Sequence, residues 1–285
     1  MIENECYLCK CKQHTVRGVV RDNPSISVLE CSSCGLVFLS NCSHITEDFY
    51  ESSGMHASDD IELEQWRLET AADDERRVKF CLNILSDAGK SLLDVGCGNA
   101  GFLLKLKNQV GHVAGVEPEK RFYPCFSSEK IMVYPNIHDV PGKYELVTAF
   151  HVLEHVLDPI AFLHSVAETL TEHGQLIIET PNASDALLSF YQCEAFACFT
   201  YWSCHVMLYN QETLRKLVEQ SGLQLKYIQQ VQRYPLSNHL YWLGCGKPGG
   251  HNVWGRINSV NLNEEYAKQL AEMGCCDTLI ACISK

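Results

Sequence analysis

The sequence predicts an α/β protein in which a doubly wound parallel sheet follows a small metal-binding module. Three observations lead to this prediction. Short apolar segments of strand length alternate with helical patterns along most of the chain. A glycine-rich loop, Gly96–Gly101, directly follows the apolar segment Ser91–Val95, and Cys-x-x-Cys pairs stand near the N-terminus. We therefore expect the metal-binding module at residues 1–42, a helical linker or lid at 43–90, and the α/β domain at 91–285.

The composition limits both the class of protein and the class of partner. Of the 285 residues, 46% are apolar and 20% are charged, as in ordinary soluble domains. No apolar run approaches the roughly 20 residues that span a bilayer, and the first residues, MIENECYLCK, lack the pattern of a signal peptide. The formal net charge of −12 opposes binding to nucleic acid, which usually requires a basic surface. We expect a cytoplasmic protein with a small-molecule substrate, and neither nucleic acid nor a membrane as partner.

Four of the 16 cysteines form two Cys-x-x-Cys pairs separated by 21 residues. Two such turns bring four thiolates together in the tetrahedral shell of a structural Zn²⁺. Gly35 follows the second pair and permits the positive φ that such a turn often needs. Val19–Val20 and Ile26–Leu29 predict the hairpin of a zinc ribbon, while Cys11 and Cys42 are alternative ligands. The predicted ligands are Cys6, Cys9, Cys31 and Cys34.

The glycine-rich loop predicts a nucleotide-like cofactor, and one side chain beside it narrows the choice. With Glu117 placed 21 residues after Gly96, the loop fits a dinucleotide-binding fingerprint. Asp94 precedes the first glycine by two residues, however, and its carboxylate would repel a pyrophosphate. S-Adenosylmethionine has no phosphate and presents cationic groups, so Asp94 suits this cofactor better. The glycines allow close approach of the backbone, and Glu117 can accept both ribose hydroxyls.

The motifs of this region, taken in series, resemble those of class I S-adenosylmethionine-dependent methyltransferases. DVGCGNAGF followed by GVEP resembles their first motif and the acidic end of their second strand. FHVLEHVLDP and GQLIIETP resemble their fourth- and fifth-strand segments. The subgroup includes ubiquinone-pathway O-methyltransferases and zinc-containing sugar C-methyltransferases. The resemblance implies a Rossmann-like seven-stranded sheet of order 3-2-1-4-5-7-6 with strand 7 antiparallel. It also implies cofactor-binding roles for Asp94, Gly96, Gly98, Gly101, Glu117, Pro118, His138 and Phe150.

Three histidines are candidates for the chemistry at the acceptor. Methyl transfer needs alignment of nucleophile and sulfonium, and a base where the acceptor must lose a proton. His151, Glu154 and His155 stand at helical spacing, so in a helix they would share one face; they either act on the acceptor or orient the loop beneath the cofactor. His205 matches a pocket histidine of the family, but the residues before it depart from the Tyr-x-Glu-His pattern of the sugar enzymes. The same side chains also resemble the metal-binding Glu-x-x-Glu-His motif of small-RNA 3′-end methyltransferases, with histidine in place of the first glutamate.

Two further segments bear on the acceptor. Phe49–Met55 loosely resembles the lid of the sugar enzymes, or is a polar linker, and Glu62–Leu85 has apolar residues at helical spacing. Residues 234–262 are rich in aromatic residues and glycine and lie between the last two predicted strands. Insertions at this edge of the sheet are where such enzymes vary their acceptor contacts. This insertion predicts either an acceptor pocket or the surface of a homodimer.

These features predict S-adenosylmethionine-dependent methyl transfer to a small polar acceptor, such as a nucleotide sugar, a polysaccharide or a natural-product intermediate. A zinc-ribbon RNA methyltransferase is the alternative within enzymes, and the net charge opposes it. A non-catalytic zinc-ribbon scaffold with a vestigial methyltransferase domain is a third hypothesis, which the intact Asp94, glycine loop and Glu117 oppose.

Overall fold

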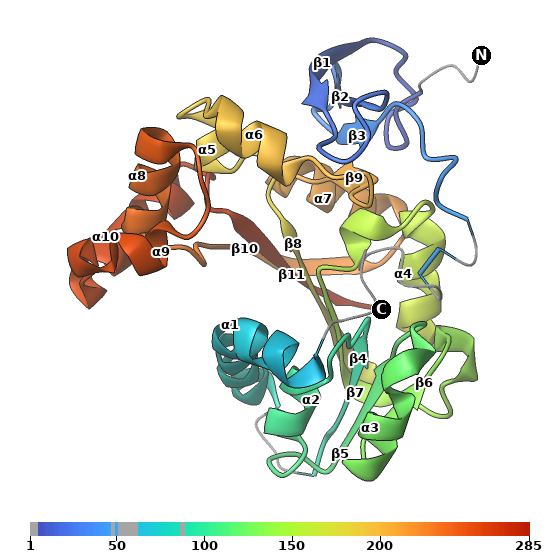
Figure 1. Cartoon of the computed structure of the whole chain (residues 1–285). Helices are drawn as coiled ribbons and strands as arrows, with labels where there is room; N and C mark the ends of the chain where they lie inside the picture. Colours follow the sequence, from blue (N-terminus) through green and yellow to red (C-terminus); the bar gives the residue numbers. More distant parts are fainter. Residues whose placement is uncertain (1–4, 47–48, 51–61, 86–88) are drawn as a thin grey trace.

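The computed structural model describes residues 5–46, 49–50, 62–85 and 89–285. Its seven-stranded sheet consists of β4 (Ser91–Val95), β5 (His112–Val116), β6 (Met132–Tyr134), β7 (Tyr144–Phe150), β8 (Leu170–Pro181), β10 (Gln224–Val231) and β11 (Thr278–Ser284). The strands lie in the order β6-β5-β4-β7-β8-β11-β10 (Figure 1). The first five are parallel, whereas β11 is antiparallel to both β8 and β10. The predicted order 3-2-1-4-5-7-6, with strand 7 antiparallel, is confirmed.

Helices cover both faces of this sheet, as a doubly wound fold requires. The helices that pack on it are α1 (Leu63–Ile84), α2 (Gly101–Leu106), α3 (Tyr123–Ser128), α4 (Pro159–Glu168) and α7 (Gln211–Gln220). Along β4, Leu92 packs with α1, α2 and α3, while Leu93 packs with α4 and α7, because successive side chains of a strand point to opposite faces. No helix in the described part of the chain combines the length and apolarity needed to cross a membrane.

The predicted insertion at residues 234–262 forms a helical layer near the β10–β11 side of the sheet (Figure 1). Its helices gather with two short ones that follow β8. The group consists of α5 (Ala186–Ser189), α6 (Glu194–Thr200), α8 (Leu236–Cys245), α9 (Gly250–Val253) and α10 (Val260–Glu272).

The N-terminal module is joined to the α/β domain through a shared sheet. Its strands are β1 (His14–Val19), β2 (Ser27–Cys31) and β3 (Val37–Leu39), and β1 and β2 form the predicted hairpin. A fourth strand, β9 (Met207–Leu208), comes from the α/β domain and pairs with β3. Leu36 and Val206 also belong to one continuous core, so the module and the domain pack as one body.

Candidate functional site

Four cysteine sulfurs converge in the N-terminal module and lie within 4.8 Å of one another. Two of the pairs are 3.4 and 3.5 Å apart. The two Cys-x-x-Cys turns have similar backbone geometry. The residue directly after each pair, Lys10 and Gly35, has a positive φ angle, 59° and 77° respectively. Cys11 and Cys42 are not part of this group. Its members are the predicted Cys6, Cys9, Cys31 and Cys34, and four thiolates so placed fit the tetrahedral shell of Zn²⁺.

The glycine-rich loop turns sharply between β4 and α2. Gly96 and Gly98 have φ angles of +73° and +50°, which glycine adopts without strain. A Cβ atom on Gly96 would lie 2.5 Å from Cγ2 of Val152, and one on Gly101 would lie 2.6 Å from Oδ2 of Asp74. The loop therefore requires small residues, and its backbone can approach a cofactor closely.

Asp94 lies at the end of β4 and is 4% exposed. Thr148 Oγ1 on the neighbouring strand β7 donates a 2.7 Å hydrogen bond to its carboxylate. Burial raises the pKa of Asp94 to about 7, against the lowering effects of Thr148 and of the Arg77 charge. A cationic ligand would stabilise the ionised form of such a buried carboxylate. The sequence analysis expects this role for the cationic amino-acid end of the cofactor.

Glu117, at the end of β5, faces the same loop. Its carboxylate accepts hydrogen bonds from the backbone nitrogens of Gly98 (2.9 Å) and Glu119 (3.0 Å). Burial raises its pKa. Asp94 and Glu117 thus stand on adjacent strands at the carboxyl edge of the sheet, where ligands bind in open α/β folds.

The other predicted cofactor residues have different environments. Pro118 is half-buried directly after Glu117, whereas His138 is exposed on the turn after β6. Phe150 is buried, with the Phe102 ring at 5.2 Å and the Arg77 guanidinium carbon 4.6 Å from its ring centre.

Helix α1 packs against the glycine-rich loop, a contact that the sequence did not predict. Arg67 Nε donates to the carbonyl of Asn99 (2.9 Å), and Asn99 Nδ2 donates to Thr70 Oγ1 (3.0 Å). A Cβ on Gly98 would lie 3.3 Å from the ring of Trp66. These contacts place α1 directly against the glycine-rich loop.

Two of the histidines predicted for the acceptor chemistry, His155 and His205, come together with Glu154 in a largely buried cluster. One ligand atom from each of Glu154, His155 and His205 lies within 4.8 Å of the other two. His155 Nδ1 donates to the carbonyl of Cys204 (2.8 Å), because a carbonyl can only accept, and Nε2 is then left as the acceptor nitrogen. His205 Nδ1 is buried and has no hydrogen-bond partner among the described residues. We refer to these three residues as the Glu-His-His cluster.

The charge states in this cluster follow from burial and from neighbouring charges. Burial lowers the pKa of His205 to about 3, assisted by His155, and lowers that of His155 as well. Burial opposes ionisation of Glu154, but the hydrogen bond and charge of His151 hold its pKa at about 2. Near neutral pH the cluster therefore holds one carboxylate and two neutral imidazoles.

His151 does not share a helix face with Glu154 and His155, and this expectation was wrong. It has a φ of +56°, and only Leu153–His155 forms a 3₁₀ turn. Its Nδ1 lies 3.1 Å from Glu154, and its Nε2 lies 3.1 Å from Arg233 Nη1.

Arg233 and His151 belong to a network of charged and partly buried side chains from four separate segments. Glu179 at the end of β8 is fully buried and pairs with Arg76 and Arg77 of α1. His151 Nε2 is 3.3 Å from Glu179. Among these residues, sequence reasoning could have flagged only Glu179, because a carboxylate inside an apolar strand needs a buried partner.

The N-terminal module holds the segment that carries His205. Asp22 accepts hydrogen bonds from the Ser203 backbone nitrogen (3.0 Å) and from Ser203 Oγ (2.5 Å). Leu39 N donates to the carbonyl of Val206 (3.1 Å). The module therefore flanks His205 on both sides, and the position of this imidazole depends on it.

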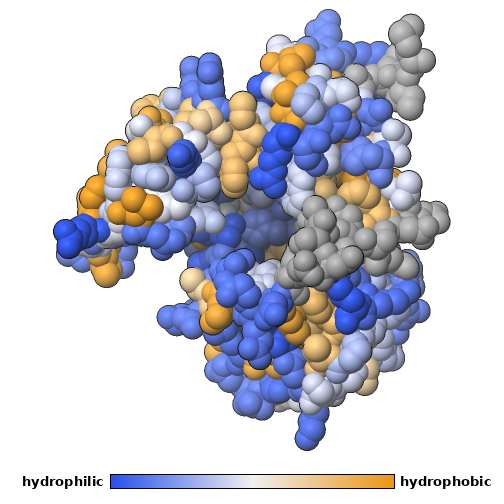
Figure 2. Space-filling view, in the orientation of Figure 1, coloured by the Kyte–Doolittle hydropathy of each residue, from blue (hydrophilic) through white to orange (hydrophobic). Residues whose placement is uncertain are grey.

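A pocket of about 290 Å³ lies beside the cluster, bounded by the helical layer and the ends of β8, β10 and β11. Figure 2 shows the molecule hollowed between the part that contains α8–α10 and the part that contains α1 and α2. Burial raises the pKa of Asp185 to about 7 and also raises that of Asp277. The residues that matter most for its chemistry are His151, His205, Asp185, Asp277, Phe199 and Trp242.

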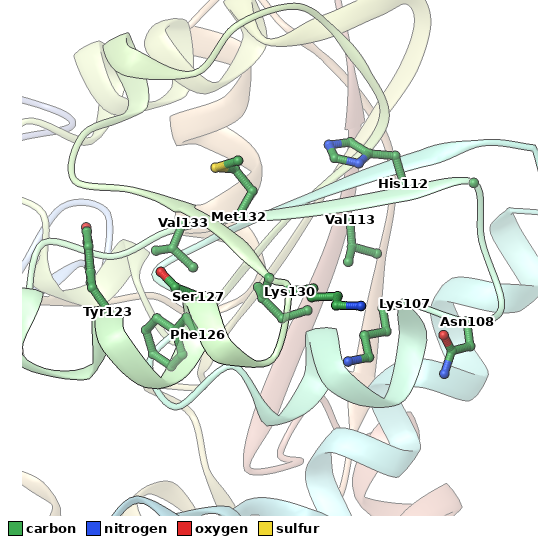
Figure 3. Close-up of a pocket in the computed structure, with 12 residues that line it drawn as sticks. Lys107, Asn108, His112, Val113, Tyr123, Phe126, Ser127, Lys130, Met132 and Val133 are labelled. Carbon is green, nitrogen blue, oxygen red and sulfur yellow. The ribbon is translucent and has the colours of Figure 1, made fainter.

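A larger hollow of about 860 Å³ lies elsewhere, between α2, α3 and the starts of β5 and β6. Figure 3 shows Lys107, Lys130 and His112 around it. It adjoins the amino ends of the strands, opposite the edge that carries Asp94 and Glu117. Because ligands of open α/β sheets bind at the carboxyl edge, we do not assign this hollow to the cofactor.

Comparison with known proteins agrees with this arrangement. A family model described as a methyltransferase domain matches residues 64–228. The tRNA U34 carboxymethyltransferase of Alteromonas mediterranea is 31% identical over 32% of this chain and 32% of its own length. The ubiquinone biosynthesis O-methyltransferase of Hydrogenovibrio crunogenus is 24% identical over 58% of this chain and 77% of its own length.

Among solved structures, a chain from the complex between the Haloferax volcanii Trm112 methyltransferase activator and a methyltransferase aligns with a TM-score of 0.50. It is 13% identical, and the alignment covers 80% of this chain and 99% of that one, a likeness of fold alone. The family match spans almost all of α1, the glycine-rich loop, Glu117 and the Glu-His-His cluster, and covers more than half of the chain. The chain belongs to this family of methyltransferase domains, and it spans about a third of the length of the first of these relatives.

Proposed function

We propose that this enzyme methylates a small polar acceptor of the class of a nucleotide sugar, polysaccharide or natural-product intermediate. The pocket of about 290 Å³ beside the Glu-His-His cluster carries the proposal. A pocket of this size accommodates a small molecule or one unit of a larger one. Aromatic walls combined with carboxylates and imidazoles suit a polar ring, because they offer apolar contact and hydrogen-bond acceptors together.

We assign the cofactor to the carboxyl edge of the sheet, where S-adenosylmethionine would supply an activated methyl group on a cationic sulfonium. In this assignment Asp94 attracts the cationic amino-acid end, Glu117 accepts the ribose hydroxyls, and Gly96, Gly98 and Gly101 permit close approach. Pro118, His138 and Phe150 complete the site as the resemblance implies.

The Glu-His-His cluster is assigned to the acceptor side. His205 lines the pocket and is neutral near pH 7, so it can accept a hydrogen bond from an acceptor hydroxyl. His155, also neutral, lies next to it in the cluster. His151 also lines the pocket, but its two nitrogens already face Glu154 and Arg233. We therefore propose His205 and His155 for the chemistry, with His151 as a positioning residue.

A structural Zn²⁺ is assigned to Cys6, Cys9, Cys31 and Cys34. A shell of four thiolates leaves no open coordination position, so this ion would stabilise the fold and take no part in methyl transfer.

The proposal is tested by incubating the enzyme with methyl-labelled S-adenosylmethionine and a panel of nucleotide sugars and hydroxylated metabolites. For a methylated acceptor, Trp242→Ala and Asp185→Asn should raise its KM about tenfold while the affinity for S-adenosylmethionine stays unchanged. Leu240→Ala, on the exposed side of the same helix α8, is the matched control and should behave as the wild type. Equal KM values for all these variants would contradict the proposed acceptor pocket.

RNA is the second candidate acceptor, favoured by the zinc-ribbon-like module and by similarity to a protein named tRNA U34 carboxymethyltransferase. The net charge of −12 opposes it. Methylation of total tRNA that falls steeply as salt rises would replace the small-molecule proposal, because binding to phosphates releases counterions.

A further inference from the structure

We propose that the Glu-His-His cluster is a binding site for a second divalent transition-metal ion, distinct from the four cysteines. Among the described residues, only these two groups bring three or more potential ligands within 4.8 Å of one another. Two imidazoles and one carboxylate form the donor set of catalytic Zn²⁺ sites and of related transition-metal sites, which keep open positions for another ligand.

The hydrogen bonds around the cluster leave donor atoms free for a metal. His155 uses Nδ1 to donate to the carbonyl of Cys204, so Nε2 carries the lone pair that a metal needs. Such a bond from the second ring nitrogen to a carbonyl is typical of metal-binding histidines, because it fixes both tautomer and orientation. The carboxylate of Glu154 is supported in the same way, since Thr180 Oγ1 donates to its Oε2 at 3.1 Å.

His205 supplies an independent observation. Its Nδ1 is buried without a hydrogen-bond partner among the described residues, and a buried polar atom without a partner destabilises a fold. The ring lies 5.1 Å from that of His155, centre to centre. A bond to a metal would satisfy this nitrogen, whereas among the described residues no protein group does.

The position of the cluster indicates what the ion would do. His205 lines the acceptor pocket, so an open coordination position can receive an oxygen of the acceptor. A divalent ion lowers the pKa of a bound hydroxyl. The O–CH₃ bond then forms as the S–CH₃ bond breaks, and the hydroxyl proton leaves to solvent. This role, unlike the binding itself, rests on the proposed function and narrows the acceptor to one with an ionisable hydroxyl.

The test is the metal content of the untagged full-length chain and its titration with Co²⁺. We expect two equivalents. One gives the intense sulfur-to-cobalt charge-transfer bands of thiolate ligands, and the second gives only ligand-field bands of nitrogen and oxygen ligands. His205→Ala and Glu154→Gln should each lose the second equivalent and keep the first. His164→Ala, a histidine of α4 that bonds the Ser221 carbonyl away from the cluster, is the control and should keep both.

A single equivalent in the wild type would overturn the inference even if the variants fail to fold. Two equivalents in a folded His205→Ala variant would also overturn it. Methyl transfer to a small acceptor without a second bound ion would support the proposed function and contradict the metal site. A second bound ion without methyl transfer to any hydroxylated small molecule would support the metal site and contradict the proposed function.

Discussion

Two separate constraints favour glycine at position 96: a positive φ angle and the lack of space for a side chain. Gly96 has a φ of +73°, and an added Cβ would lie 2.5 Å from Val152. Gly222 has almost the same φ, +75°, with nothing within 4 Å of an added Cβ.

Gly222→Ala should therefore lose only the conformational term, about 1 kcal/mol of unfolding free energy. Gly96→Ala should lose a further 1–3 kcal/mol, roughly, because the methyl group overpacks against Val152. Urea unfolding of both variants measures the difference. Equal losses of unfolding free energy in the two variants would mean that the loop moves to accommodate the added methyl group, and that it is less tightly packed than the structure indicates.

The pKa of Asp94, raised to about 7 by burial from the ordinary value of 3.8, gives a second prediction at this scale. The folded chain binds this proton more tightly than the unfolded chain, so the contribution of Asp94 to stability falls as the pH rises from about 4 to 7. A cationic cofactor prefers the ionised form, so its affinity should rise with pH.

Between pH 5.5 and 7.5, where an α-amino group stays largely protonated, we expect the affinity for S-adenosylmethionine to rise on the order of tenfold. Asp94→Asn should bind weakly and show no such rise. Calorimetric titrations at several pH values check this. A pH-independent affinity in the wild type would show that Asp94 does not face the cation.

Individual site residues could be predicted from the sequence where their signal is local. Asp94 and Glu117 lie at fixed distances from the glycines in the sequence, so the motif predicted both as residues of the candidate site. Arg77 and Arg233 could not be found in this way, because they come from separate segments and only the fold brings their charges together. Glu179 could have been flagged only as a carboxylate inside an apolar strand. The expectation that His151 shares a helix face with Glu154 and His155 was wrong for a different reason, because the spacing of residues in the sequence does not reveal a positive φ angle.

At the scale of elements, strand β3 and the loop at Asp22 fix the segment that carries His205. The strands of the central sheet could be predicted, because glycine turns and apolar runs mark them locally. The pairing of β3 with β9 could not, because two residues far along the chain carry no pattern of their own.

The two hydrogen bonds from Ser203 make Asp22 a positioning residue for the segment that carries His205. Asp22→Ala removes both hydrogen bonds to Ser203 and should lower kcat about tenfold while leaving S-adenosylmethionine affinity unchanged. Tyr7→Phe, which removes a different contact between module and domain, the 2.6 Å bond to Asp158, is the matched control. A loss of activity in both variants alike would point to general destabilisation rather than to the position of His205.

At the scale of the whole molecule, the N-terminal module and the α/β domain share one core. Cys6, Leu8 and Leu36 pack in the same cluster as Val206 and Tyr209. A module of this size would unfold separately if its core were its own.

Cys31→Ser, which removes one of the four proposed zinc ligands, should lower the Tm of the entire chain by several degrees. The thermal transition should remain single by circular dichroism and by calorimetry. A low-temperature transition of the module alone, with the main transition unmoved, would contradict a common core.

The central claim is that S-adenosylmethionine binds between the glycine loop, Asp94 and Glu117, and calorimetric titration of the full-length chain tests it most directly. We predict one cofactor per wild-type chain and a loss of affinity of about tenfold or more in Glu117→Ala, whose carboxylate faces the loop. Glu119→Ala, in which the lost carboxylate pairs with Arg121 instead, should bind as the wild type does. Unchanged affinity in a folded Glu117→Ala variant would contradict the account.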